Sequence, residues 1–158
     1  MTLEEELTLT TLYLEIERVR LGERLDVRVA VPHAIRRARV PSFLLQPLVE
    51  NAVRHGIAPH EAGGTLTVSA ERAGDLLRLA VRNEALTDAD AVGVAVAVHP
   101  AIDNRANDDG PASRGIGLAN TRARLEALYG ERQRLAFAPL GATGAEVVIE
   151  LPYREAES

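Results

Sequence analysis

Two segments that lie far apart in the sequence carry the side chains best suited to bind a charged ligand. The first, residues 41–57, predicts a helix with one apolar side and one polar side. The polar side combines an acid, a carboxamide and two bases: Glu50, Asn51, Arg54 and His55. A carboxamide oxygen suits Mg²⁺, which shares its coordination with water and phosphates. Taken alone, each of these residues reads more readily as a solvated helix residue, so the prediction of a magnesium-bound polyphosphate depends on a second motif.

That second motif is a glycine-rich loop that leads into a helix expected over Ile116–Tyr129. Gly115 and Gly117 let the backbone approach an anion closely, and the start of a helix adds partial positive charge. Arg114, directly before them, is placed to bind a terminal phosphate through its forked guanidinium group. An ordinary tight turn with a surface arginine is the alternative for this loop alone, so the combination of the two segments carries the prediction.

Asn83 is a third candidate, at the end of the second strand of a predicted hairpin. Its side-chain oxygen can accept a hydrogen bond from an amino group such as that of adenine. The alternative is a turn residue that ends a strand, a common role for asparagine. The four histidines are scattered and lack the spacing of a metal site: His33, His55, His60 and His99.

The composition limits the classes of function. A length of 158 residues suits one domain with a real core, and with only 3% aromatic residues that core must be aliphatic. The net charge of −5, without a basic patch, disfavours nucleic-acid binding. The absence of cysteine excludes disulfides, thiolate metal sites and a cysteine nucleophile. No apolar run approaches the roughly 20 residues of a bilayer span, so we expect no direct membrane contact.

The first element expected is a helix over Leu3–Arg20, ended by Gly22. Its apolar residues recur at the 3, 4, 3 spacing of a coiled coil: Leu9, Leu12, Ile16 and Val19. Two interpretations follow. The helix either lies on its own domain, or is the tail of a longer helical hairpin that pairs with another subunit.

The remaining elements complete a fold of helices among paired strands. A helix from Pro41 to Gly56 carries the first motif, and Gly74 turns a hairpin. Strands are expected over five ranges: 25–31, 65–71, 76–82, 134–138 and 146–152. The long connection 84–114, rich in Ala, Asp, Asn and Gly, is expected to be a mobile lid. The pattern predicts an α/β (α+β) two-layer sandwich, a mixed sheet covered on one face by helices.

Residues 41–57 resemble the N box of sensor histidine kinases of the LytS-like group, whose partners are LytTR-type response regulators. Residues 114–120 resemble the G2 box of the same family, and residues 121–130 continue its pattern. The resemblance implies a Bergerat (GHKL) ATP-binding domain over residues 23–158, with 84–114 as the ATP lid. Residues 1–22 would be the tail of the dimerisation and phosphoacceptor region. ATP and Mg²⁺ are the implied cofactors.

By this resemblance, Asn51 ligates Mg²⁺ and Glu50 lies beside the γ-phosphate. The residues implied to contact the nucleotide are Arg54, His55, Asn83, Arg114, Gly115, Gly117, Leu118 and Asn120. Two departures from the family pattern bear on this set. The sequence Asn83-Glu84-Ala85-Leu86 stands where Asp-x-Gly-x-Gly is usual, and Pro47 replaces the basic glutamate of hydrolysing relatives, so hydrolysis of ATP by an activated water is not expected.

The function implied is the transfer of the γ-phosphoryl group of ATP to a histidine in an upstream segment, and from there to a response regulator. No histidine of this chain matches the phosphoacceptor pattern, so we expect no kinase activity from the chain alone. The full-length protein is expected to be a homodimer with this domain at the cytoplasmic end of a membrane-bound sensor. Two alternatives stay open: a degenerate module that docks a partner without nucleotide, and a stand-alone serine kinase of the anti-sigma type, against which the leading helix argues.

Overall fold

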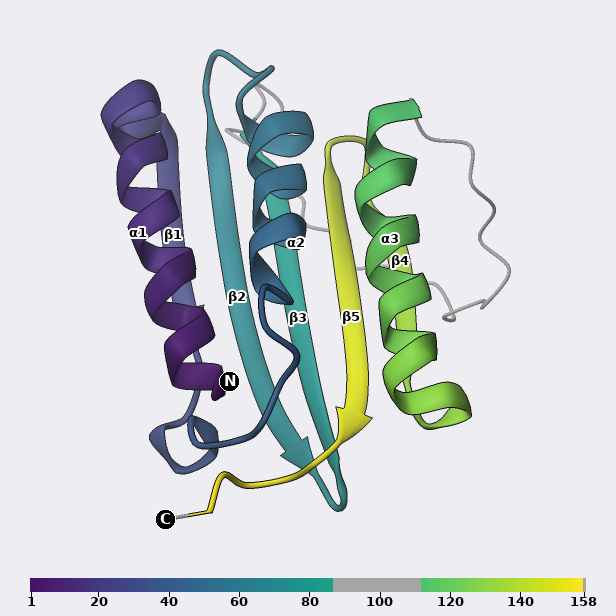
Figure 1. The fold of residues 1–158 in the computed structure, drawn as a ribbon. Coiled ribbons are helices and arrows are strands. Elements are labelled where there is room, and N and C mark those ends of the chain that lie inside the picture. Colours follow the sequence, from purple (N-terminus) through teal and green to yellow (C-terminus); the bar gives the residue numbers. More distant parts are fainter. Residues whose placement is uncertain (87–111, 158) are drawn as a thin grey trace.

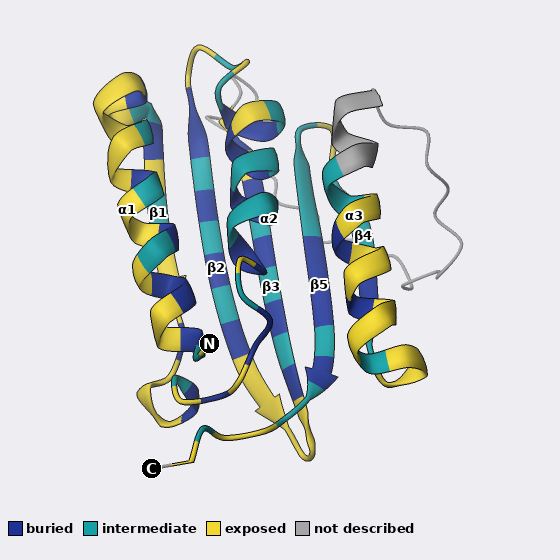
Figure 2. Cartoon of the chain, viewed as in Figure 1, coloured by how far each residue is buried: buried dark blue, intermediate teal, exposed yellow. Residues whose placement is uncertain are grey.

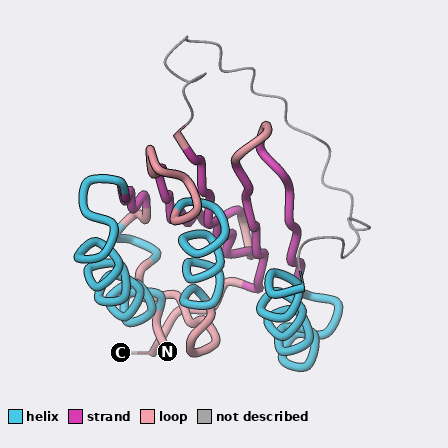
Figure 3. The backbone as a smooth tube through the Cα atoms, turned by 90° about the horizontal axis from the view of Figure 1, so that it is seen from above, coloured by secondary structure: helices cyan, strands magenta, loops and turns pink. Residues whose placement is uncertain are grey.

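The computed structural model describes residues 1–86 and 112–157 of the chain (Figure 1). It contains the helices α1 (Leu3–Leu21), α2 (Leu45–Asn51) and α3 (Ala112–Tyr129). Its strands are β1 (Leu25–Ala30), β2 (Gly64–Ala73), β3 (Leu76–Ala85), β4 (Arg134–Leu140) and β5 (Gly144–Pro152). The strands form one sheet in the order β1-β2-β3-β5-β4, in which only β1 and β2 are parallel. All three helices lie against the same face of this mixed sheet (Figures 1 and 3), which confirms the predicted fold class.

An aliphatic core lies between the sheet and the helices. Along β2, buried residues alternate with partly exposed ones, and Leu66 and Val68 point toward the helices. The same alternation on β3 buries Leu79 and Val81, and it appears as dark stripes along the strands in Figure 2. The predicted hairpin is therefore confirmed, with each strand three residues longer than predicted: β3 at the end away from the turn, and β2 by one residue at that end and two at the turn. Among the described residues, no helix combines the length and the apolar character needed to cross a membrane.

Helix α1 matches its predicted range and packs against its own domain. Thr2 and Glu5 form a capping box at its start, and Gly22, with φ of 61°, ends it. The side chains that join the core are Leu3, Leu7, Leu14 and Leu21. This packing supports the first of the two interpretations of the helix. The assignment of residues 1–22 to a dimerisation region stays a prediction, because the structure holds one copy of the chain.

Helix α2 begins at Leu45 and not at the predicted Pro41. Its N-terminal residue offers no side-chain cap, and the buried carboxylate of Glu6 on α1 supplies one instead. Glu6 accepts hydrogen bonds from the backbone N–H groups of Phe43, of Leu44 at 2.9 Å and of Leu45 at 3.0 Å. This capping charge also complements the helix dipole. Because the helix starts at Leu45, Pro47 falls in its first turn, where no backbone N–H is needed.

The end of this helix differs from the prediction as well. Beyond Asn51 the backbone continues as a π-helical segment, Ala52–Ile57, so Gly56 lies inside the helix and is not its stop. The guanidinium group of Arg24 donates hydrogen bonds to the carbonyl oxygens of Ala58 at 3.1 Å and His60 at 2.6 Å. These two acceptors lie just after the π-helical segment, so Arg24 satisfies carbonyl groups at the end of this helix. π-Helical turns are uncommon and occur often at functional sites.

The region predicted as a lid, 84–114, is divided by the structure. Glu84 and Ala85 still belong to β3, and α3 begins at Ala112. Residues 87–111 lie outside the described part of the chain. The expectation of a mobile lid therefore stays a prediction.

Candidate functional site

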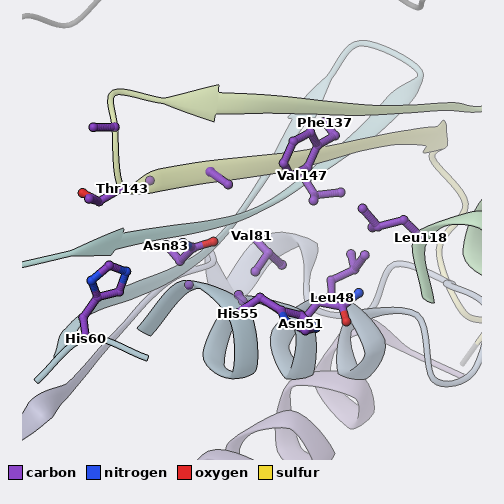
Figure 4. Close-up of a pocket in the computed structure, with 15 residues that line it drawn as sticks. Leu48, Asn51, His55, His60, Val81, Asn83, Leu118, Phe137, Thr143 and Val147 are labelled. Carbon is purple, nitrogen blue, oxygen red and sulfur yellow. The ribbon is translucent and has the colours of Figure 1, made fainter. Parts of the chain in front are cut away.

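One pocket of about 150 Å³ lies between the helix that carries Asn51, strand β3, the β4–β5 hairpin and α3 (Figure 4). It brings together residues from all three of the predicted motifs: Asn51 and His55 from the first helix, Asn83 from β3, and Leu118 from α3. Its floor is aliphatic, formed by residues such as Leu48, Val81 and Val147. An engineered cavity of roughly this volume admits a benzene ring, so the pocket is large enough for one flat ring system.

Asn83 lies at one end of the pocket, together with His60 and Thr143 in Figure 4. It is only 7% exposed and lies within β3, where the sequence had placed it at the strand end. Gly56 packs directly against it. A methyl group at Gly56 would overlap the Asn83 amide nitrogen and lie 2.6 Å from its Cγ atom. Glycine is therefore required at this position for the side chain of Asn83 to lie where it does.

Asn51 lies at the other end of the pocket, next to α3. Gly117 of α3 packs against it so closely that a methyl group there would lie 2.8 Å from the Asn51 amide nitrogen. That nitrogen is buried and has no hydrogen-bond partner among the described residues. A buried polar atom without a partner is uncommon and indicates a missing acceptor or donor. The carboxamide can donate to a phosphate oxygen in this orientation, or present its oxygen to a cation when it is turned over.

The glycine pattern does not form a loop before α3, contrary to the prediction. Helix α3 begins at Ala112, so Arg114, Gly115 and Gly117 all belong to it. Only the first four backbone N–H groups of a helix lack an acceptor within it, and this set includes Gly115 but not Gly117. The role that the structure supports for Gly117 is the close approach to Asn51. The side chain of Arg114 lies outside the described part of the structure.

Glu50 and Arg54 do not line the pocket, although the sequence placed them with Asn51 and His55 on one polar side. Gln46 donates to the Glu50 carboxylate at 3.0 Å. Glu50 and Arg54 both act on Tyr13 of α1. Partial burial of Tyr13 is the main reason that its pKa is raised to about 12, and the negative charges of Glu17 and Glu50 add to the shift. The positive charge of Arg54 opposes it. These two charged residues therefore lie on the side of the helix that faces α1.

Asn120 is also separated from the pocket. It lines a second pocket of about 200 Å³ between α2 and α3, which Gly117 also lines, with Phe43 and Pro47 among the other residues. Phe43 adopts a φ of 56°, which is unusual for a residue with a bulky side chain, and 56% of it is exposed. Of the sequence-predicted set, the first pocket therefore gathers Asn51, His55, Asn83 and Leu118, with Gly117 against Asn51.

Several residues at the pocket were missed from the sequence, among them Gly56, His60 and Thr143. Gly56 was interpreted as a helix stop and Thr143 as part of a connecting turn. The Thr143 hydroxyl donates to the carbonyl oxygen of Ala85 at 3.4 Å, so the β4–β5 turn is tied to the end of β3. A turn that brings a hydroxyl to the end of a neighbouring strand gives no local signal in the sequence.

The residues that the structure describes include no cluster of three or more His, Cys, Asp or Glu side chains that could hold a metal ion. At the end of the pocket next to α3, Asn51 offers one neutral carboxamide oxygen. Mg²⁺ commonly binds through one or two protein groups together with phosphates and water. The donor set therefore fits a magnesium ion that arrives with a phosphate ligand, and does not fit a resident structural metal.

Comparison with known proteins gives the family. Residues 39–155 match the family of histidine kinase-, DNA gyrase B- and HSP90-like ATPases, called HATPase_c. The chain belongs to this family. Within it, the chain is 27% identical over 155 residues to the sensor histidine kinase BtsS of Escherichia coli K12, covering 98% of this chain and 24% of BtsS. It is 26% identical over 157 residues to the sensor histidine kinase/phosphatase LytS of Staphylococcus aureus, covering 99% of this chain and 26% of LytS.

Among solved structures, the catalytic domain of the histidine kinase ThkA in a nucleotide-free form superposes with a TM-score of 0.64. The match covers 99% of this chain and 97% of that domain at 13% identity, and so concerns the HATPase_c fold alone. ThkA has also been solved in complex with the response regulator protein TrrA. The predicted resemblance to sensor histidine kinases, with LytS among them, is confirmed. The HATPase_c chain spans about a quarter of the length of BtsS and LytS.

Proposed function

We propose that this HATPase_c chain binds ATP with Mg²⁺ in the first pocket and acts as the catalytic domain of a sensor histidine kinase. The observation that carries the proposal is the meeting of Asn51, Asn83 and Leu118 around one pocket, although they come from three separate segments. Family membership makes ATP the ligand to test first. In this proposal the adenine lies inside the pocket, whose volume suits one flat ring, and the phosphates lie at the Asn51 end.

Each pocket residue has a proposed task. Asn83 accepts a hydrogen bond from the adenine amino group, in the position where the family pattern has an aspartate. Asn51 holds the magnesium ion through its side-chain oxygen, and the backbone N–H of Gly115 at the start of α3 faces the phosphates. When bound, Mg²⁺ supplies charge neutralisation on the phosphates. Catalysis then consists mainly of positioning the γ-phosphoryl group.

The charged residues outside the pocket are proposed to act at the far end of the nucleotide. Glu50 and Arg54 lie on the α1 side of the helix and His55 on the pocket side. We keep Arg54, His55 and Arg114 as candidates for the phosphate side and Glu50 for the γ-phosphate. Leu118 contributes apolar contact within the pocket. Asn120 is the weakest member of the predicted set, because it lines the second pocket.

Isothermal titration calorimetry with ATP, with and without Mg²⁺, tests the nucleotide site. The wild-type chain is expected to bind ATP, and Asn83→Ala is expected to lower the affinity with or without Mg²⁺. Asn51→Ala is expected to remove the gain in affinity that Mg²⁺ provides. Leu128→Ala, at an exposed position of α3, serves as the control and should bind like wild type. The proposal fails if the wild-type chain gives no binding signal, or if Asn51→Ala and Asn83→Ala behave like the control.

The place of the domain in a longer protein is a further part of the proposal. The γ-phosphoryl group would pass to a histidine in an upstream dimerisation segment and then to a response regulator of the LytTR type. The similarity to LytS and the solved complex of ThkA with a response regulator support this order. We propose a homodimeric full-length protein with this domain on the cytoplasmic side of the membrane.

A second candidate function is a docking module that keeps the fold without using nucleotide. Two features at the third motif favour it. Asn83 lacks the charge of the usual aspartate, and β3 continues as a paired strand through Glu84 and Ala85, where the family pattern has glycines. A folded wild-type chain that shows no ATP binding in the calorimetric experiment would select this candidate.

A further inference from the structure

The carboxamide of Asn83 lies at one end of the first pocket, and it can act as a donor or as an acceptor. Asn83 is 7% exposed, and Gly56 packs directly against its amide group. The oxygen and the –NH₂ group of a carboxamide are close in size, and hydrogen bonding decides which of them points which way. Turning the amide over therefore exchanges donor and acceptor, while the packing of Asn83 against Gly56 is kept.

The polar side chains beside Asn83 are equally able to donate and to accept. His60 and Thr143 lie at the same end of the pocket (Figure 4). A neutral imidazole ring donates from one nitrogen and accepts at the other, and a hydroxyl group does both. Among the described residues that line the pocket, none is an Asp, Glu, Lys or Arg. This end of the pocket therefore carries no fixed charge that would demand a donor, or an acceptor, on the ligand.

The rest of the pocket wall offers contacts that do not distinguish one purine from another. Val81, Val147 and Phe137 supply apolar surface to the pocket. Contact of such side chains with the flat face of a base tolerates any base, because every base has such a face. The choice between purines of similar shape is therefore left to the group that meets the edge of the ring, which is Asn83.

We propose that the first pocket accepts 6-oxopurine nucleoside triphosphates as well as ATP, and that the amide of Asn83 makes both possible. At position 6, adenine carries an amino group, which donates, whereas guanine and hypoxanthine carry a carbonyl oxygen, which accepts. The oxygen of Asn83 accepts from the amino group of adenine. With the amide turned over, its nitrogen donates to the carbonyl oxygen of a 6-oxopurine from the same place. This inference rests on the proposed nucleotide site and specifies the class of base that the site takes.

The substitution Asn83→Asp isolates this property, because a carboxylate has nearly the shape of the carboxamide but can only accept. Facing the amino group of adenine, an acceptor is kept. Facing the carbonyl oxygen of a 6-oxopurine, it opposes one acceptor to another with no hydrogen between them. A site built around a hydrogen bond rejects a ligand that cannot make it, and one lost hydrogen bond corresponds to about tenfold in affinity.

Calorimetric titration with ATP and with inosine triphosphate, both with Mg²⁺, tests the proposal. Inosine triphosphate differs from ATP only at the edge of the ring that Asn83 meets. The wild-type chain should bind it with a Kd less than about tenfold above that for ATP, because no hydrogen bond is lost. Asn83→Asp should keep ATP binding and raise the ratio of the two Kd values by about tenfold or more. Leu128→Ala, at an exposed position of α3, is the matched control and should keep the wild-type ratio.

Two results would overturn the inference while the proposed ATP site stands. One is a wild-type chain that binds ATP but binds inosine triphosphate about tenfold or more weakly. The other is a ratio of Kd values that Asn83→Asp leaves unchanged, since the tolerance would then not come from the amide.

Circular dichroism checks that Asn83→Asp is folded. If it is not, Asn83→Ala replaces it and should lower the affinity for both nucleotides by a similar factor of about ten. A loss of ATP affinity alone would then overturn the inference. A wild-type chain that binds neither nucleotide would refute the proposed function itself, and this inference with it.

Discussion

The contact between Gly56 and Asn83 yields the sharpest prediction about how the pocket is built. A methyl group at Gly56 would lie 2.6 Å from the Asn83 Cγ atom, about 1 Å closer than ordinary carbon–carbon contact. Overpacking of this kind typically destabilises a protein by about 1–3 kcal/mol. Replacing a glycine by alanine inside a helix otherwise stabilises it by about 0.5–1 kcal/mol. Gly56→Ala in the wild-type background should therefore lower the free energy of unfolding by a net 1–2 kcal/mol, roughly.

The same substitution should have the opposite sign when Asn83 is shortened. The atoms of Asn83 in the overlap are Cγ, Nδ2 and Oδ1, and Asn83→Ala removes all three. In that background, Gly56→Ala should raise the free energy of unfolding by about 0.5–1 kcal/mol. The coupling energy between the two positions is then about 1.5–3 kcal/mol, well above the roughly 0.5 kcal/mol at which distant sites deviate from additivity.

Urea unfolding of the four proteins in this double-mutant cycle, followed by the circular dichroism of the helices, measures the coupling. The slopes with urea should stay equal, so that changes in midpoint report stability. If Gly56→Ala has the same effect in both backgrounds, the two residues do not touch in solution, and the described arrangement of this end of the pocket is wrong. Gly56→Ala alone should also weaken ATP binding, because it displaces the proposed adenine contact.

Three further perturbations test other contacts. Glu6→Ala leaves buried backbone N–H groups at the start of α2 without an acceptor, so it should lower the free energy of unfolding in urea by on the order of 3 kcal/mol. Glu6→Gln keeps one acceptor oxygen and should have a stability between those of Glu6→Ala and the wild type. Equal stability of all three proteins would refute the cap. Gly117→Ala should weaken ATP binding in the presence of Mg²⁺ in the wild-type background, but have little effect in the Asn51→Ala background. Equal losses of ATP affinity in both backgrounds would show that Gly117 does not act through Asn51. The raised pKa of Tyr13, about 12 in the folded state against about 10 when unfolded, means that its contribution to stability is present below pH 10 and is lost between pH 10 and 12. Tyr13→Phe should reduce this loss in unfolding experiments over that pH range, and an unchanged pH profile would refute the assignment.

Local patterns in the sequence predicted most of the fold. The alternation of apolar residues in 65–71 and 76–82, with Gly74 between them, was sufficient for the β2–β3 hairpin. The 3.6-residue period was sufficient for α1, whose end at Gly22 also matched. These features depend on near neighbours in the chain, and tertiary packing extended the strands without changing their type.

The boundaries of α2 and α3 depended on distant contacts and were predicted less well. The start of α2 at Leu45 is set by Glu6, which lies far away in the sequence and approaches only when α1 packs on the domain. By local rules, a proline such as Pro41 is a suitable first residue of a helix. Nothing in the local sequence indicates that the carboxylate of Glu6, on another helix, accepts hydrogen bonds from the N–H groups of residues 43–45. The same holds for Gly56, whose task is set by Asn83 on a different element.

The candidate site was predicted in outline. The sequence paired Asn51 with the glycine segment and added Asn83, and the structure gathers Asn51, Asn83 and Leu118 around one pocket, with Gly117 against Asn51. It also separates Glu50 and Arg54 from Asn51, since neither lines the pocket and both act on Tyr13 of α1. Helical spacing alone could not decide which part of the polar side faces the pocket.

The most direct test of the central claim is a nuclear magnetic resonance titration of the labelled chain with ATP and Mg²⁺, observing side-chain and backbone amides. The account predicts that the side-chain amide signals of Asn51 and Asn83 and the backbone amide signals of Gly117 and Thr143 shift together as the nucleotide binds. It is contradicted if these four signals stay in place at saturating nucleotide, or if the shifts gather instead around Phe43 and Asn120 at the second pocket.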